Sequence, residues 1–200
     1  AINWRAYMRL EKLFLKLFQV EPRIPVRLLI DTSASMVPKF DYARRLAAAL
    51  CYVGMVRLDT ITIRGFSDRL DEPVVCSGGR HRFLPAVAYL EALQCQRPSD
   101  YLGVAREFVS AHPQRGMLIV VSDFLDGNGV SKPLQLLGNF GHELLTVQVW
   151  SPEDREPPYE GELELVDAET GNTLELAFDD AARAFGRNPS RVGERWALHP

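Results

Sequence analysis

The sequence predicts an α/β fold of the Rossmann-like kind, with a mostly parallel central sheet and helices on both faces. Short runs of β-branched and aliphatic residues alternate with longer segments of helical periodicity, which is the pattern of βαβ units. Two of the runs, residues 28–30 and 118–121, are apolar without alternation, as expected of central strands covered on both faces. A chain of 200 residues is also long enough to bury a core without disulfides or a structural metal.

Five runs are expected to form the sheet. The parallel strands are predicted at residues 26–30, 60–66, 117–121 and 144–150. After Phe66 the segment SDRLDEP can turn the chain back, so that residues 74–76 form an antiparallel edge strand.

Apolar residues at three- and four-residue steps predict the helices. Residues 39–56 are expected to form the crossover helix after the first strand, because one face of this segment carries Phe40, Ala43, Ala47, Leu50 and Val53. Further helices are predicted over residues 84–93, 101–111 and 131–140, with prolines in the first turns of the first and last of these.

The two ends of the chain follow other patterns. Residues 162–166 and 173–178 flank the turn-rich segment DAETGN, which predicts a C-terminal β-hairpin, and a short helix is expected over residues 179–185. Residues 186–200 have no periodicity and are expected to form a mobile tail. Residues 13–18 are almost wholly apolar, and either a helix or a strand would satisfy them. The chain begins without Met, and we expect it to be a fragment of a longer protein.

Charge and cysteine content exclude several classes of function. A net charge of −3 and a pI near 5.9 give no electrostatic reason to bind nucleic acid or an anionic membrane surface. The longest stretch without a charged residue, residues 46–56, is well short of the roughly 18 residues that a membrane span needs. Cys51, Cys76 and Cys95 are flanked by apolar residues and predict reduced thiols in a cytoplasmic compartment.

Carboxylate and hydroxyl side chains follow the two predicted central strands where they end. Asp31, Ser33 and Ser35 come after the first strand in the spacing Asp-x-Ser-x-Ser. Asp123 follows the second central strand, and Ser99 stands in the loop RPSDYLG just ahead of a helix. The carboxyl ends of parallel strands meet at one edge of the sheet, so these side chains are expected to converge. Hard oxygen ligands of this kind favour Mg²⁺ or Mn²⁺ over softer metals.

Two other interpretations of these residues stay open. Asp31 and Asp123 could accept hydrogen bonds at strand ends while the serines cap helices, which are common structural uses of both residue types. The second interpretation is a phosphohydrolase. Aspartate-nucleophile phosphatases also place an Asp at the end of a strand, and the segment SDFLD, residues 122–126, resembles their metal-binding loop. Those enzymes carry a second acid two positions later, whereas this chain has Ser33, which cannot protonate a leaving group at neutral pH.

No other catalytic pattern is present in the sequence. A Gly-rich phosphate loop of the G-x-x-x-x-G-K-[ST] type is absent. The histidines at positions 81, 112, 142 and 199 lie in unrelated contexts and are expected to be surface or loop residues. We therefore expect the chain not to be an enzyme.

Several segments resemble a known superfamily and one of its families. IDTSASM, the serine loop at Ser99 and VVSDF are similar to the metal-ion-dependent adhesion site (MIDAS) of the von Willebrand factor A (VWA) superfamily. INWRAYMRLEKLFLKLF, KFDYARRLAAAL and LVDAETG resemble the bacterial family known as domain of unknown function 58 (DUF58), over residues 2 to about 185. The resemblance implies a single VWA-like domain over residues 1–185, of which residues 1–25 come from the family's upstream region.

The resemblance also implies a set of metal ligands. Asp31, Ser33, Ser35 and Asp123 would coordinate Mg²⁺, or Mn²⁺ or Ca²⁺ in its place, and Ser99 would take the position of the usual Thr. Ser keeps the hydroxyl but loses the methyl group that stiffens the rotamer, which makes Ser99 the least secure ligand. Outside these ligands, the candidates for supporting residues are Asp100 and Asp126.

The function implied by the resemblance is metal-dependent protein recognition. An Asp or Glu of a partner protein would fill the open position of the cation, and the expected partner is a MoxR-type ATPase of the AAA+ class, beside which the chain would act as an adaptor or chaperone. A metal-free scaffold with a vestigial site is the alternative. The expected location is the bacterial cytoplasm. Because some family members carry membrane helices upstream, the full-length protein could be membrane-associated.

Overall fold

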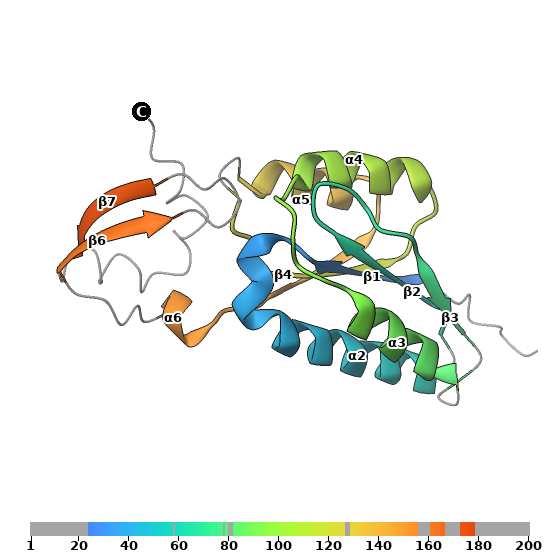
Figure 1. Cartoon of the computed structure of the whole chain (residues 1–200). Helices are drawn as coiled ribbons and strands as arrows, with labels where there is room; N and C mark the ends of the chain where they lie inside the picture. Colours follow the sequence, from blue (N-terminus) through green and yellow to red (C-terminus); the bar gives the residue numbers. More distant parts are fainter. Residues whose placement is uncertain are drawn as a thin grey trace, which may run out of the picture.

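The central sheet has five strands, in the order β3-β2-β1-β4-β5. The computed structural model describes residues 24–57, 59–77, 79, 82–126, 129–155, 161–166 and 173–178. The strands of the sheet are β1 (Val26–Asp31), β2 (Ile61–Phe66), β3 (Val74–Cys76), β4 (Met117–Ser122) and β5 (Glu143–Gln148). All neighbouring pairs are parallel except β2 and β3, which are antiparallel (Figure 1). The predicted sheet, with its antiparallel edge strand, is confirmed.

Helices cover both faces of the sheet. The described helices are η1 (Ala34–Lys39), a 3₁₀ helix, and α2 (Phe40–Val56), α3 (Leu84–Ala92), α4 (Tyr101–Ala111), α5 (Ser131–Asn139) and α6 (Pro152–Arg155). Figure 1 shows α2 and α3 on one face and α4 and α5 on the other. The four long helices agree with the predicted ones to within one residue at each end. The sequence did not predict η1 or α6, because segments of six and four residues are too short to show a helical period.

Alternation along β1 explains its unbroken apolar run. Leu28 and Ile30 pack with Ala47 of α2 in one buried cluster, whereas Leu29 packs with Phe108 of α4 in the other. Successive side chains of a strand point to opposite faces. Asp31, two residues after Leu29, therefore faces the side of the sheet that α4 covers.

The order of the strands determines where a ligand site can form. From β1 the chain continues to β2 on one side, and β4 and β5 lie on the other. In open sheets of this kind the loops at the carboxyl ends separate at such a reversal and leave a crevice. The register pairs Ile30 with Val121, so the ends of β1 and β4 are adjacent. Asp31 and Asp123 thus leave the sheet at the same edge.

The structure describes less of the C-terminal region. β6 (Gly161–Val166) and β7 (Thr173–Phe178) pair in an antiparallel, two-stranded sheet. Residues 167–172 between them lie outside the described residues, so the predicted hairpin stays a prediction. The predictions for residues 1–23 and 179–200 also fall outside the described part of the chain. Within the described ranges, no helix combines the length and apolar character needed to cross a bilayer.

The three cysteines are free thiols, as predicted. Cys51 and Cys76 are buried and Cys95 is half-buried. Burial raises the pKa of Cys51 and of Cys95 to about 12. The thiols therefore stay protonated at neutral pH and act as small apolar side chains.

Two histidines pack at the edge of the sheet where β4 and β5 begin. The rings of His112 and His142 lie 4.7 and 5.5 Å from the ring of Phe108. His142 is buried and lies in the loop before β5, which agrees with the expectation of a surface or loop residue. Burial, and then the positive charge of Arg27, lowers the pKa of both histidines.

The lowered pKa values of this histidine pair predict that the two residues contribute less to stability at acidic pH than at neutral pH. A histidine with a lowered folded-state pKa contributes stability above its unfolded-state pKa of about 6.5, and that stability is lost as the pH falls through the folded-state value. Asp31, whose folded-state pKa is raised to about 6, acts in the opposite direction over this pH range. We therefore expect the free energy of unfolding of His142→Phe, which keeps the contact with Phe108, to change between pH 7 and pH 5 in a more favourable direction than that of the parent. Urea unfolding of both proteins at pH 5, 6, 7 and 8 measures the difference. Identical pH profiles would show that His142 does not contribute.

Candidate functional site

Backbone hydrogen bonds connect the loops that carry the predicted site residues. Ala34, the first residue of η1 after β1, donates its N–H to the carbonyl of Arg97 at 2.9 Å. Asp100 donates its N–H to the carbonyl of Ser67, after β2, also at 2.9 Å. The segment containing Ser99 is therefore fixed beside the ends of β1 and β2.

Asp31 is completely buried and its carboxylate accepts three hydrogen bonds. Oδ1 accepts the backbone N–H of Ser33 at 2.8 Å, which closes the turn after β1. Oδ2 accepts the hydroxyl of Tyr101 at 2.6 Å and the hydroxyl of Ser122 at 2.7 Å. The two hydroxyl oxygens are themselves 2.6 Å apart. Asp31 thereby joins the ends of β1 and β4 to the first residue of α4.

The environment of Asp31 holds its pKa above the usual range. Burial raises this pKa to about 6, and the negative charge of Asp123 adds to the rise. The hydrogen bonds from Tyr101, Ser122 and Ser33 act in the opposite direction. Two acids that repel each other in a buried site create a negative potential, which favours a cation.

The hydroxyls of Ser33 and Ser35 form the part of the site best suited to a metal. Their Oγ atoms are 3.0 Å apart. Ser33 is buried and Ser35 half-buried. Adjacent ligands of an octahedral Mg²⁺ at its usual bond length of 2.0–2.1 Å are separated by about 2.9 Å. This spacing fits two neighbouring ligands of one small cation.

The acids near these serines are few. Among the residues that the structure describes, no three His, Cys, Asp or Glu side chains come together in a way that could hold a metal ion. Any cation bound here would therefore depend on hydroxyl oxygens as well as on Asp31 and Asp123. Oxygen ligands of this type fit Mg²⁺, Mn²⁺ or Ca²⁺ and do not fit the softer metals.

Asp123 is buried in a tight turn after β4. Its Oδ1 accepts the backbone N–H of Leu125 at 3.0 Å. Between them Phe124 has a φ of 57°, a left-handed conformation that is uncommon for an aromatic residue. The N–H of Phe124 donates to the hydroxyl of Ser122 at 2.7 Å. Strained backbone of this kind is most frequent at functional sites.

Lys39, the last residue of η1, places an ammonium group at Asp123. Its Nζ lies 3.0 Å from Oδ2 of Asp123 and 2.7 Å from Oδ2 of Asp154. The Lys39 side chain is 3% exposed. Burial alone would lower its pKa, but the charges of the two acids outweigh that effect and the pKa is raised. A protonated lysine is thus the cation that the chain itself supplies to this site.

The other predicted residues, Asp100, Ser99 and Asp126, differ from one another in their environments. Asp100 is the N-cap of α4, where its Oδ1 accepts the N–H of Gly103 at 2.8 Å, which gives it a structural function. Ser99 precedes it and is half-buried. Asp126 is also half-buried, and its carbonyl accepts the N–H of Gly129 at 3.0 Å.

Sequence reasoning missed three residues of this site. Ser122 and Tyr101 each adjoin a predicted site residue, so their positions were a usable signal. The signal for Lys39 was weaker, because it is only a single charged residue in the segment SMVPKF. Their contacts depend on how the strands and helices pack, which the local sequence does not reveal.

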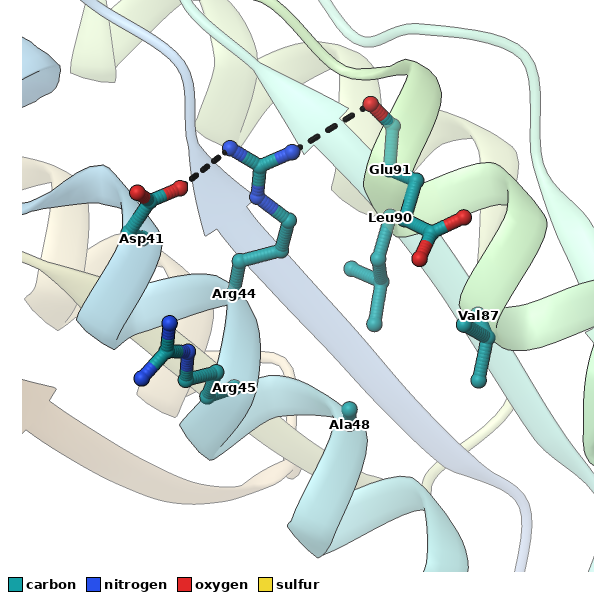
Figure 2. Close-up of a pocket in the computed structure, with 7 residues that line it drawn as sticks. All are labelled: Asp41, Arg44, Arg45, Ala48, Val87, Leu90 and Glu91. Atoms are coloured by element: carbon teal, nitrogen blue, oxygen red, sulfur yellow. Dashed lines mark hydrogen bonds and ion pairs between the residues drawn. The ribbon is translucent and has the colours of Figure 1, made fainter.

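A separate groove lies between α2 and α3 and contains none of these residues. Figure 2 shows Arg44 spanning it, with hydrogen bonds to the carboxylate of Asp41 at 2.6 Å and to the carbonyl of Glu91 at 3.3 Å. The walls are lined by Asp41, Arg44, Arg45, Ala48, Val87, Leu90 and Glu91. The hydrogen bond from Arg44 to Glu91 connects the two helices, whereas that to Asp41 lies within α2.

Comparisons with known proteins identify uncharacterised relatives. The family model described as "Protein of unknown function DUF58" matches residues 1–191. An uncharacterised protein of Mycobacterium bovis is 29% identical over 169 residues, which are 78% of this chain and 52% of the relative. An uncharacterised protein of Mycobacterium avium is 40% identical over 70 residues, 35% of this chain and 41% of the relative. The chain spans about half the length of the curated relatives it matches.

Solved structures align with this chain at low sequence identity. The conserved hypothetical protein BatB from Bacteroides thetaiotaomicron aligns with a TM-score of 0.50 and 15% identity, over 86% of this chain and 85% of BatB. A von Willebrand factor type A structure from Catenulispora acidiphila aligns with a TM-score of 0.46 and 12% identity, over 62% of this chain and 32% of that one. The sheet and helices described above share the fold of BatB. With a family match over residues 1–191, this chain belongs to the DUF58 family.

Proposed function

We propose that this chain is a MIDAS-type, metal-dependent protein-binding module. Asp31, Ser33, Ser35, Ser99 and Asp123 would hold Mg²⁺, or Mn²⁺ or Ca²⁺ in its place. The observation that carries the proposal is the pair of serine hydroxyls 3.0 Å apart, in a site that also contains two buried carboxylates.

The chemistry of these oxygens leaves room for a partner. Mg²⁺ requires six oxygens in near-octahedral positions, and the proposed set contains only two carboxylates among neutral hydroxyls. A bound ion would therefore retain positive charge and at least one exchangeable position. A carboxylate from an Asp or Glu of another protein would complete the coordination and give a directional contact.

A MoxR-type ATPase of the AAA+ class is the partner that we propose, with this chain as its adaptor or chaperone. The support comes from the family resemblance and from the interaction function common among VWA-like domains. Binding of a purified ATPase of this class to the parent chain and to Ser35→Ala, both in Mg²⁺, tests the pairing. The variant is preferable to a chelator, because nucleotide hydrolysis by the ATPase itself depends on Mg²⁺.

The residue two positions after Asp31 argues against a phosphohydrolase. Aspartate-nucleophile phosphatases need a second acid two positions after the nucleophile to protonate the leaving group. Ser33, two residues later, cannot act as a general acid. We therefore propose a binding module and not an enzyme.

One observation favours the second candidate, a metal-free scaffold. The ammonium of Lys39 already lies 3.0 Å from Asp123 and neutralises charge at the site. A chain that satisfies its own acids in this way can fold without any metal. The two candidates differ in whether the chain binds a divalent cation at all.

Calorimetric titration with Mg²⁺ and Mn²⁺, together with thermal unfolding, separates the two candidates. The parent chain should give a saturable heat and a rise in Tm, since a ligand at 100 times its Kd stabilises the folded state by about 2.7 kcal/mol. Ser35→Ala should lose both responses. Ser110→Ala, an exposed serine of α4, is the matched control and should keep them. No response in any of the three proteins would favour the scaffold.

A further inference from the structure

Lys39 is positioned to interact with any cation that approaches Asp123. It directly precedes α2 and stands four residues after Ser35, so the backbone of η1 holds it next to the serine turn. Its ammonium is almost completely buried and contacts the same carboxylate that the proposed metal site would use. A buried charge at this place is costly unless it is paired.

We propose that Lys39 is a built-in competitor of the metal: its ammonium neutralises Asp123 in the metal-free chain, and metal binding displaces it toward Asp154. This inference rests on the proposed function, because it assumes that the site binds a divalent cation. It adds a regulatory element to that site, in which the resident ammonium lowers the affinity for the metal.

The second partner of Lys39 makes such a displacement feasible. Asp154 lies 2.7 Å from Nζ, closer than Asp123, and its side chain is 32% exposed. An ammonium that leaves Asp123 would thus keep one carboxylate and would move toward water. If the ammonium stayed in place, two cations would share one carboxylate and repel each other strongly at this distance.

The same contact connects the site to α6. Oδ2 of Asp154 also accepts the backbone N–H of Ser151 at 2.8 Å, and the hydroxyl of Ser151 accepts the N–H of Asp154 at 3.1 Å. Asp154 therefore ties Lys39 to the first turn of α6. A change at Asp123 would reach this segment through a single side chain.

Two variants with opposite expected effects test the proposal by calorimetric titration with Mn²⁺. Lys39→Met removes the competing charge but keeps an unbranched side chain, and its affinity for Mn²⁺ should rise about tenfold or more. Asp154→Asn removes the second partner of the ammonium, so Lys39 depends on Asp123 alone, and the affinity should fall several-fold. Arg115→Met loses one exposed positive charge at the opposite edge of the sheet and should bind as the parent does.

The outcomes separate this proposal from the function on which it rests. If the parent binds Mn²⁺ saturably and Lys39→Met and Asp154→Asn bind it with the same affinity, Lys39 does not compete with the metal and the proposal is overturned. No binding in the parent, in Lys39→Met or in Asp154→Asn would instead overturn the metal site itself. If Lys39→Met is unfolded without metal, folding on addition of Mn²⁺ supports the proposal. If it stays unfolded, the affinity of Asp154→Asn decides, and a value equal to that of the parent overturns the proposal.

Discussion

Lys39→Met is expected to lower the free energy of unfolding by about 3–5 kcal/mol in metal-free buffer, because breaking a buried ion pair leaves an uncompensated charge. The carboxylate that loses its partner is that of Asp123, which is 2% exposed. Asp154 is half-buried and can turn to water. Urea unfolding in the presence of a chelator measures the change.

Two further variants show whether the unpaired charge is the cause. Lys39→Met combined with Asp123→Asn removes both members of the pair and should recover most of the lost stability. Arg97→Met breaks a surface pair with Asp68, whose members are 40% and 45% exposed, and should cost less than about 1 kcal/mol. If Lys39→Met were no more destabilising than Arg97→Met, the Lys39–Asp123 pair would not be a significant buried interaction.

Tyr101→Phe is expected to cost about 1.5–3 kcal/mol, the range for a hydrogen bond to a charged group. The lost hydroxyl lies 2.6 Å from Oδ2 of Asp31 and 2.6 Å from the hydroxyl of Ser122. The ring would keep its contacts, since its centroid is 5.5 Å from that of Phe66 and 6.3 Å from that of Phe124. The hydrogen bond from Tyr101 lowers the pKa of Asp31, so its removal should raise that pKa further.

A second tyrosine provides the control for this change. Tyr42 of α2 is 64% exposed, and Tyr42→Phe should leave the unfolding free energy within about 0.5 kcal/mol of the parent value. Unfolding curves of both variants at pH 7 give the comparison. Equal stability of Tyr101→Phe and the parent would mean that water replaces the hydroxyl at Asp31.

The fold was predictable because it depends on local patterns. Residues 28–30 and 118–121 are apolar without interruption, and only strands covered on both faces need this composition. The ends of these strands also located Asp31 and Asp123 at one edge, since parallel strands share a direction. Short crossover connections allow only a few strand orders, and the sequence patterns alone did not choose among them.

The environment of the site was not predictable from the same patterns. A single lysine is normally exposed, and Lys39 is buried because Asp154, 115 residues later in the chain, reaches it from α6. Tyr101 was expected only as the start of a helix. Its hydroxyl meets Asp31 because α4 packs on the face of β1 to which Asp31 points, a contact between residues 70 apart. Such contacts depend on tertiary packing.

The most direct test of a metal site is a crystal structure of the chain grown with Mn²⁺ and recorded at the manganese absorption edge. We expect one anomalous peak at the carboxyl edge of the sheet, within bonding distance of the hydroxyls of Ser33 and Ser35. Lys39 should then have moved away from Asp123, from its present distance of 3.0 Å, while it still contacts Asp154. A structure with no peak there at saturating Mn²⁺, and with Lys39 still paired to Asp123, would contradict the metal-dependent function.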